Sequence, residues 1–168
     1  MPKSSAPPVP LRILVVDDDP AILNVWRRIL GPKWRRPALE PLETKPLGAA
    51  PPAVPPEAEL SIDTASHGME GHQKVISALA EARPYTFALV DMRMPGWDGL
   101  ETILRMLEKD PRLEVAICSA FSDISREEVI QRVGRSDMQW LKKPFDLEVA
   151  REMVRKLIDL GTRRRQSR

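Results

Sequence analysis

The residues of this chain that are suited to chemistry lie in four short segments far apart in the sequence. Three aspartates stand together at 17–19, and Asp91, Ser119 and Lys143 follow singly. Clustered carboxylates repel one another, so they remain ionised together only when a cation neutralises them. Carboxylate oxygens suit Mg²⁺, which usually takes one or two of them and keeps several waters. If the fold gathers these segments, we expect a magnesium site.

The same residues indicate a reaction class. A carboxylate beside a bound cation, such as Asp91, can act as a nucleophile toward a phosphoryl group. Charge on the phosphoryl oxygens must be stabilised during transfer, and Mg²⁺, the Lys143 ammonium and the Ser119 hydroxyl are suitable groups. The sequence therefore predicts phosphoryl transfer to a carboxylate.

The elements that must position these residues are short apolar runs followed by amphipathic segments. Helices are indicated over 68–80 and 126–133, and after expected caps at Asp19, Asp98 and Asp146. The buried strands are expected at 12–16, 60–65, 86–90, 115–118 and 140–141.

Strand and helix alternate five times in this interpretation. Continuous apolar strands in such an alternation predict an α/β fold with a parallel sheet covered by helices on both faces. Sites in such folds form at the carboxyl ends of the strands. The segments carrying Asp17, Asp91, Ser119 and Lys143 each follow or end a predicted strand, so all should leave the same edge of the sheet.

Four motifs in order resemble the signature of response-regulator receiver domains of two-component signalling, the CheY-like family. They are VVDDD at 15–19, DMRMPGWDG at 91–99, CSA at 118–120 and KPF at 143–145. The resemblance covers residues 11–160 apart from an insertion. It implies a doubly wound, flavodoxin-like (βα)5 fold with five parallel strands in the order 2-1-3-4-5.

The resemblance also implies a metal site and a phosphoacceptor. Asp91 would be the phosphoacceptor. Asp18 would bind Mg²⁺ directly, Asp17 would be its partner, partly through water, and the backbone carbonyl of Arg93 would complete the site.

Three further residues take roles by the same resemblance. Ser119 would reorient to hydrogen-bond the phosphoryl group, and Lys143 would form an ion pair with it. Trp140 would be the aromatic residue coupled to Ser119 in the switch. The peptide bond between Lys143 and Pro144 is the candidate for a cis bond.

The implied function is a signalling switch rather than an enzyme. The phosphoryl group would come from a sensor histidine kinase or a phosphotransfer protein in a phosphorelay, and a downstream effector or fused output domain would receive the signal. In this family the surface formed by the fourth helix, fifth strand and last helix often pairs with a second copy, so the resemblance is compatible with a homodimer.

Two alternatives remain beside the switch. One is a receiver-like adaptor that works without phosphorylation. The other is a haloacid-dehalogenase-type phosphatase, whose nucleophile follows the first strand in a D-x-D-x-[TV] pattern. Asp17 and Asp19 have that spacing, but Ala21 does not fit the fifth position.

Proline divides the chain into regions. Four of the 17 prolines lie in residues 1–10, an expected flexible segment, and eight lie in a proline-rich insertion at 31–58. The insertion should lie at the sheet edge opposite the site, so phosphorylation should not need it. Residues 161–168 (GTRRRQSR) are expected to form a solvated basic tail, without the pattern of a nucleic-acid contact.

The overall composition favours a cytoplasmic protein. The net charge of +2 is too close to balance to indicate nucleic-acid binding. One cysteine, Cys118, excludes an internal disulfide and fits a reducing compartment. We find neither an apolar run of the ~20 residues that a membrane span needs nor the apolar core of a signal peptide.

Overall fold

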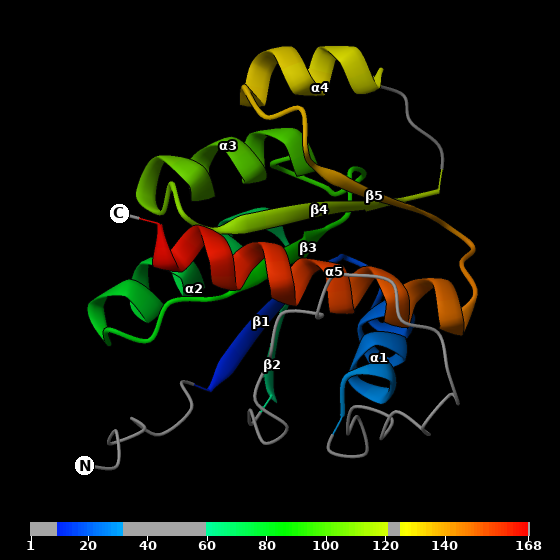
Figure 1. Ribbon diagram of the computed structural model, residues 1–168. Helices are drawn as coiled ribbons and strands as arrows, with labels where there is room; N and C mark the ends of the chain where they lie inside the picture. The colour runs from blue at the N-terminus through cyan, green and yellow to red at the C-terminus, as the bar shows by residue number, and fades with distance from the viewer. Residues whose placement is uncertain (1–9, 32–59, 121–124, 168) are drawn as a thin grey trace, which may run out of the picture.

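The computed structural model describes residues 10–31, 60–120 and 125–167, and within them strand and helix alternate as predicted (Figure 1). The strands are β1 (Leu11–Val16), β2 (Leu60–Ala65), β3 (Phe87–Val90), β4 (Glu114–Ser119) and β5 (Gln139–Lys142). The helices are α1 (Pro20–Ile29), α2 (Gly68–Ala80), α3 (Gly99–Lys109), α4 (Arg126–Val133) and α5 (Leu147–Gln166).

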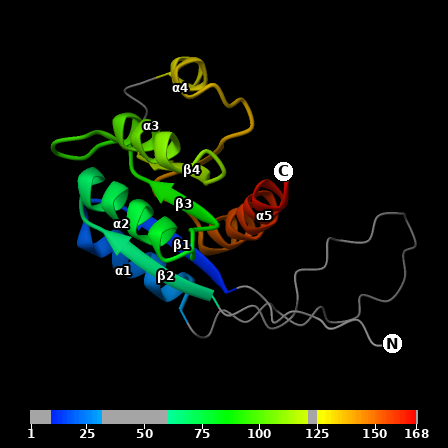
Figure 2. The same ribbon diagram turned by 90° about the vertical axis from the view of Figure 1, so that its left-hand side faces the viewer.

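All strand pairs are parallel, and the strand order β2-β1-β3-β4-β5 confirms the expected fold. Successive side chains of a strand point to opposite faces of the sheet. In β1, Leu14 and Val16 accordingly pack with α2 and α3, whereas Ile13 and Val15 pack with α1 and α5. A strand buried on both faces must be apolar throughout, which is why β1 reads as a continuous apolar run. Figure 2 shows α3 and α5 on opposite sides of the sheet.

Helix caps hold the loops that leave the carboxyl edge. The side chain of Asp19 accepts a hydrogen bond from the Ala21 amide at 2.8 Å, and that of Asp98 accepts one from the Glu101 amide at 2.8 Å. Both caps were predicted. Asp146 also stands at a helix start, but its side chain makes no capping bond. The caps therefore fix where α1 and α3 begin relative to the strands before them.

The predicted basic tail is wrong for most of its length. α5 continues to Gln166, so Arg164 and Arg165 belong to its last turns. The guanidinium group of Arg164 pairs with Glu114, and that of Arg165 pairs with Asp110. Both carboxylates are buried and lie outside α5. The sequence did not indicate these pairs because Arg164 is 50 residues from Glu114 and Arg165 is 55 residues from Asp110.

The expected flexible segment at 1–10 and the insertion at 31–58 fall outside the described residues, except for Pro10 and Gly31. The first described residue after the insertion, Leu60, pairs with Leu11 at the amino edge of the sheet. Across the three described ranges, no helix has both the length and the apolar character needed to cross a membrane.

Candidate functional site

The predicted site residues are brought together at the carboxyl edge of the sheet. Backbone hydrogen bonds continue one residue past the strands there. The amide of Asp91 donates to the Val16 carbonyl at 2.9 Å, and the amide of Lys143 donates to the Ser119 carbonyl at 2.8 Å. The amide of Asp17 donates in the same way to Ala65 at 3.1 Å. The sheet itself therefore sets the backbone positions from which these side chains project.

Lys143 joins two of the carboxylates. Its Nζ donates to Asp17 Oδ2 at 2.5 Å and to Asp91 Oδ1 at 2.9 Å. Asp17 and Asp91 are only 2% and 6% exposed. Charged groups that are removed from water need an oppositely charged partner and hydrogen bonds. The single ammonium group of Lys143 supplies both to the two buried carboxylates. This double contact was not foreseen, since the sequence analysis paired Lys143 only with a phosphoryl group.

The second oxygen of each buried carboxylate is held by its own loop. Asp17 Oδ1 accepts from the amide of Asp19 at 2.9 Å, and Asp91 Oδ2 accepts from the amide of Arg93 at 2.8 Å. In both cases an aspartate binds the amide two residues on, which is the geometry of an Asx turn. These bonds fix the orientation of both carboxylates. They also give the Arg93 backbone a role that the sequence analysis did not assign.

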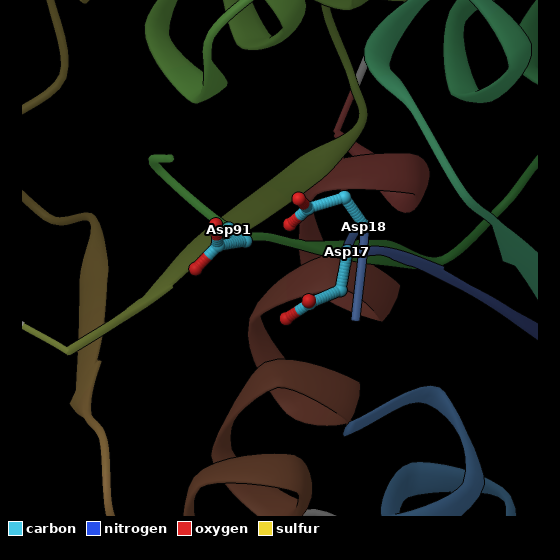
Figure 3. Close-up of side chains that lie close together, drawn as sticks. All are labelled: Asp17, Asp18 and Asp91. Atoms are coloured by element: carbon cyan, nitrogen blue, oxygen red, sulfur yellow. The ribbon is translucent and has the colours of Figure 1, made fainter. Parts of the chain in front are cut away.

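Asp18 completes an acidic cluster. One oxygen from each of Asp17, Asp18 and Asp91 can be chosen so that all three lie within 4.8 Å of one another. Figure 3 shows the carboxyl groups of Asp17 and Asp18 pointing to the side on which Asp91 lies. Asp18 is exposed, so the cluster opens to solvent at that residue. Three hard oxygen donors with access to water form a set that suits Mg²⁺.

Burial and neighbouring charges both act on the ionisation of Asp17 and Lys143. Burial raises the pKa of Asp17, and the charge of Asp91 adds to the effect, although the Lys143 hydrogen bond opposes it. For Lys143, burial works against the charged form, but hydrogen bonds to Asp17 and Asp91 leave its pKa above the ordinary value. Lys143 is therefore protonated at neutral pH, and a further cation would relieve the remaining negative charge.

Ser119 and Trp140 stand where they were predicted, at the end of β4 and within β5. Ser119 is 8% exposed. Trp140 is half-buried against the α2, α3 and α4 side of the core, with the Arg126 guanidinium 5.9 Å from its ring centroid. The Trp140 Nε1 is buried and has no hydrogen-bond partner among the described residues. Their switching roles stay predictions, as does the metal-binding role of the Arg93 carbonyl.

The peptide bond between Lys143 and Pro144 is cis, as the resemblance led us to expect.

Comparison with known families agrees with this geometry. Residues 56–155 match the family described as response regulator receiver domain. That range includes Asp91, Ser119 and Lys143, whereas Asp17 and Asp18 precede it. The match covers more than half of the chain, and it contains the third, fourth and fifth strands that form one side of the site.

Curated relatives match over part of their length. The DNA-binding transcriptional regulator NtrC of Salmonella typhimurium is 34% identical over 99 residues, covering 59% of this chain and 20% of NtrC. Sporulation initiation phosphotransferase F of Bacillus subtilis is 29% identical over 87 residues, covering 52% of this chain and 68% of that protein. The match thus spans about a fifth of the NtrC proteins.

Solved structures share the fold. A CheY-like response regulator receiver domain protein from Methanospirillum hungatei has a TM-score of 0.66 at 19% identity, over 92% of this chain and 98% of its own. The response regulator TrrA of Thermotoga maritima, solved in complex with Mg(2+)-BeF, has a TM-score of 0.61 at 24% identity, over 88% of this chain and 98% of its own. At these identities, the likeness supports the fold alone.

Proposed function

Because the chain belongs to the family of response regulator receiver domains, we propose that it is a signalling switch in which Asp91 accepts a phosphoryl group. The donor would be a sensor histidine kinase or a phosphotransfer protein. One observation carries the proposal: Lys143 bonds Asp91 and Asp17, the two buried members of a three-carboxylate cluster. A buried, oriented carboxylate beside a fixed ammonium group is the arrangement that phosphoryl transfer to aspartate requires.

The transfer is an exchange of one bond at phosphorus. A carboxylate oxygen of Asp91 forms a bond to phosphorus, the bond from phosphorus to the donor breaks, and its electron pair leaves with the donor. The amide of Arg93 and the Lys143 ammonium hold the two Asp91 oxygens beforehand, so the nucleophile is oriented before the substrate arrives. Lys143 then pairs with a phosphoryl oxygen, and the Ser119 hydroxyl donates to another.

The metal position follows from the same residues. Asp18 would bind Mg²⁺ directly, with Asp17, Asp91 and the Arg93 carbonyl as its other protein partners. When bound, Mg²⁺ supplies charge neutralisation for the phosphoryl oxygens. The donor set fits the ion because all its members are oxygens, the cluster carries excess negative charge, and exposed Asp18 leaves room for water.

The output of the switch would leave through the face formed by β4, α4 and β5. Movement of Ser119 toward the phosphoryl group would be coupled to Trp140, and this would bias that face. A downstream effector or a fused output domain would meet it, and a second copy of the chain would pair through the face formed by α4, β5 and α5. We assign the receiver unit to residues 11–166, because α5 extends beyond the expected boundary at 160.

A phosphatase of the haloacid-dehalogenase type is a weaker candidate. In that family the nucleophile follows the first strand, which would make it Asp17. Here Ala21 does not fit the fifth position of that family's pattern, and the family match is to receiver domains. A silent adaptor would not need the ordered carboxylates and lysine that the site presents.

The test is labelling with acetyl phosphate and Mg²⁺, followed by intact mass measurement. The parent protein should gain one phosphoryl group, and Asp91→Asn should gain none. Asp98→Asn is the matched control, because it changes an aspartate of the same loop while asparagine still caps α3. Equal labelling of the parent and Asp91→Asn would overturn the assignment. Continuous hydrolysis of phosphate esters would favour the phosphatase, and a folded parent that takes no label would favour the adaptor.

A further inference from the structure

The glycine that follows Asp98 has no part in the site as described so far, yet it touches the backbone of the phosphoacceptor. Gly99 is buried at the first position of α3. A Cβ atom on Gly99 would lie 2.3 Å from the carbonyl oxygen of Asp91 and 2.6 Å from the Cα of Met92. Both atoms belong to the backbone, so a side chain at residue 99 would force the chain itself to move.

The need for glycine here is one of space, not of backbone conformation. Among the described glycines, the left-handed region is occupied by Gly96 and Gly134, and not by Gly99. The Gly99 amide donates to the Met92 carbonyl at 3.1 Å, which ties the start of α3 to the segment that a side chain would push away. The start of α3 is therefore in close contact with residues 91–92 and is also hydrogen-bonded to them.

The start of α3 cannot easily withdraw to make room. The Thr102 hydroxyl donates to the Asp98 carbonyl at 2.7 Å, and the Asp98 side chain caps the helix through the Glu101 amide. Thr102 is fully buried and lies against Gly68 of α2. With α3 anchored in this way, most of the displacement would fall on the peptide after Asp91.

That peptide governs the orientation of the Asp91 carboxylate. The Asp91 amide is fixed to Val16, and the Arg93 amide, two residues on, holds Asp91 Oδ2 at 2.8 Å. A shift of residues 91–92 would break this alignment while leaving the strand ladder behind it in place. Reaction rates are sensitive to such shifts, since a misplacement of about 1 Å can cost roughly 100-fold.

We propose that Gly99 is a positioning residue for phosphoryl acceptance: its missing side chain lets the start of α3 seat against the Asp91–Met92 peptide, and this contact aims the Asp91 carboxylate. The inference rests on the proposed function of Asp91. It adds a residue that neither binds the metal nor touches the phosphoryl group.

A matched control exists at the other end of the same strand. A Cβ on Gly161 of α5 would lie 2.4 Å from the carbonyl oxygen of Thr86, directly before β3. Gly161→Ala therefore produces the same kind of backbone clash on the same strand, but far from Asp91. If the substitutions act only by disturbing packing, both variants should lose stability. If Gly99 also orients the Asp91 carboxylate, Gly99→Ala alone should label more slowly.

The experiment compares labelling rates of folded protein. The parent, Gly99→Ala and Gly161→Ala are treated with saturating acetyl phosphate and Mg²⁺, at a temperature where circular dichroism shows each to be folded. Both variants should unfold at lower urea concentration than the parent. Gly99→Ala should label at least about tenfold more slowly, while Gly161→Ala should keep the parental rate constant.

The inference would be overturned if Gly99→Ala labelled at the rate of the parent, or if Gly161→Ala were slowed as much as Gly99→Ala. If Gly99→Ala does not fold, Thr102→Val tests the same contact by loosening the anchor of α3, and it should slow labelling about threefold. An unchanged rate in Thr102→Val would then overturn the inference. Failure of the proposed function would give a different result: the parent would take no label, or the parent and Asp91→Asn would label to the same extent.

Discussion

The two edges of the sheet handle charge in opposite ways. At the carboxyl edge, three carboxylates lie close together, and one ammonium group, that of Lys143, pairs with two of them. At the amino edge, one group of described residues brings three arginines to three carboxylates. The arginines are Arg135, Arg164 and Arg165, and the acids are Asp110, Glu114 and Asp137.

The amino-edge network pairs its opposite charges among its own members. Arg164 binds Glu114 and Asp137, each at 2.7 Å, and Arg165 binds Asp110 and the Tyr85 carbonyl. Burial still raises the pKa of Glu114 despite its arginine. Matched charges thus hold the end of α5 against the loops before β4 and β5.

The difference separates a structural role from a functional one. Charge that is balanced inside the protein stabilises an arrangement, whereas excess charge of one sign leaves an affinity for something outside it. The acidic cluster at the carboxyl edge has more negative than positive charge, whereas the arginines and carboxylates of the amino-edge network balance one another. Variants of the two edges should therefore differ in the size of their response to Mg²⁺ and in the sign of their effect on stability when no divalent cation is present.

The largest effect is expected from the amino edge. Arg165→Ala leaves the 4% exposed Asp110 without its guanidinium partner, so the free energy of unfolding should fall by about 3 kcal/mol. Urea unfolding measures this. Arg163→Ala, two residues earlier on the chain, removes a more exposed pair with Asp159 and should cost less than about 1 kcal/mol. Equal losses in the two variants would show that the network contributes nothing special.

Mg²⁺ should act on the carboxyl edge alone. At a Mg²⁺ concentration tenfold above its dissociation constant, the parent should gain about 1.4 kcal/mol in free energy of unfolding. Asp18→Asn should gain less than half of this, because the proposed direct metal ligand is lost, while Asp137→Asn should keep the full gain. Unfolding in MgCl₂ against KCl of equal ionic strength measures the difference. A full gain in Asp18→Asn would remove Asp18 from the metal site.

Without divalent cations, the two edges should respond to neutralisation with opposite signs. In a chelator, Asp18→Asn should raise the free energy of unfolding by about 0.5 kcal/mol, since it relieves repulsion among the carboxylates. Asp137→Asn should lower it by about 0.5 kcal/mol, because Arg164 loses one partner. Urea midpoints at low salt are the measurement. If both variants shift in the same direction, the contrast between the edges does not hold.

The smallest effect concerns pH at a second amino-edge cluster. Burial works against ionised Asp63, but hydrogen bonds from Tyr85 and Arg12 keep its pKa below the ordinary value. Its contribution to stability is thus fully present above the unfolded-state pKa of about 3.9 and is lost as pH falls below it. Asp63→Asn should be less stable at neutral pH and should lose less stability on acidification. Parallel pH profiles for the parent and Asp63→Asn would contradict this.

Several elements could be predicted from the sequence because their signals are local. The structure has β2 at Leu60–Ala65, α2 at Gly68–Ala80 and α4 at Arg126–Val133, with the bounds that were predicted. Caps and apolar periodicity lie within a few residues of the element they define. The convergence of Asp17, Asp91 and Lys143 was predictable for a related reason, since parallel strands deliver their carboxyl ends to one edge.

What the chain determined by itself was therefore the alternation of elements and the edge at which its reactive side chains emerge. Only the tertiary structure decided that Lys143 bonds two carboxylates, one of them 126 residues away, and that α5 runs on to Gln166. It also decided that Gly99 lies against the backbone of Asp91. The physical reason is that these features depend on distances between segments, which residue order does not encode until the sheet and its helices have packed.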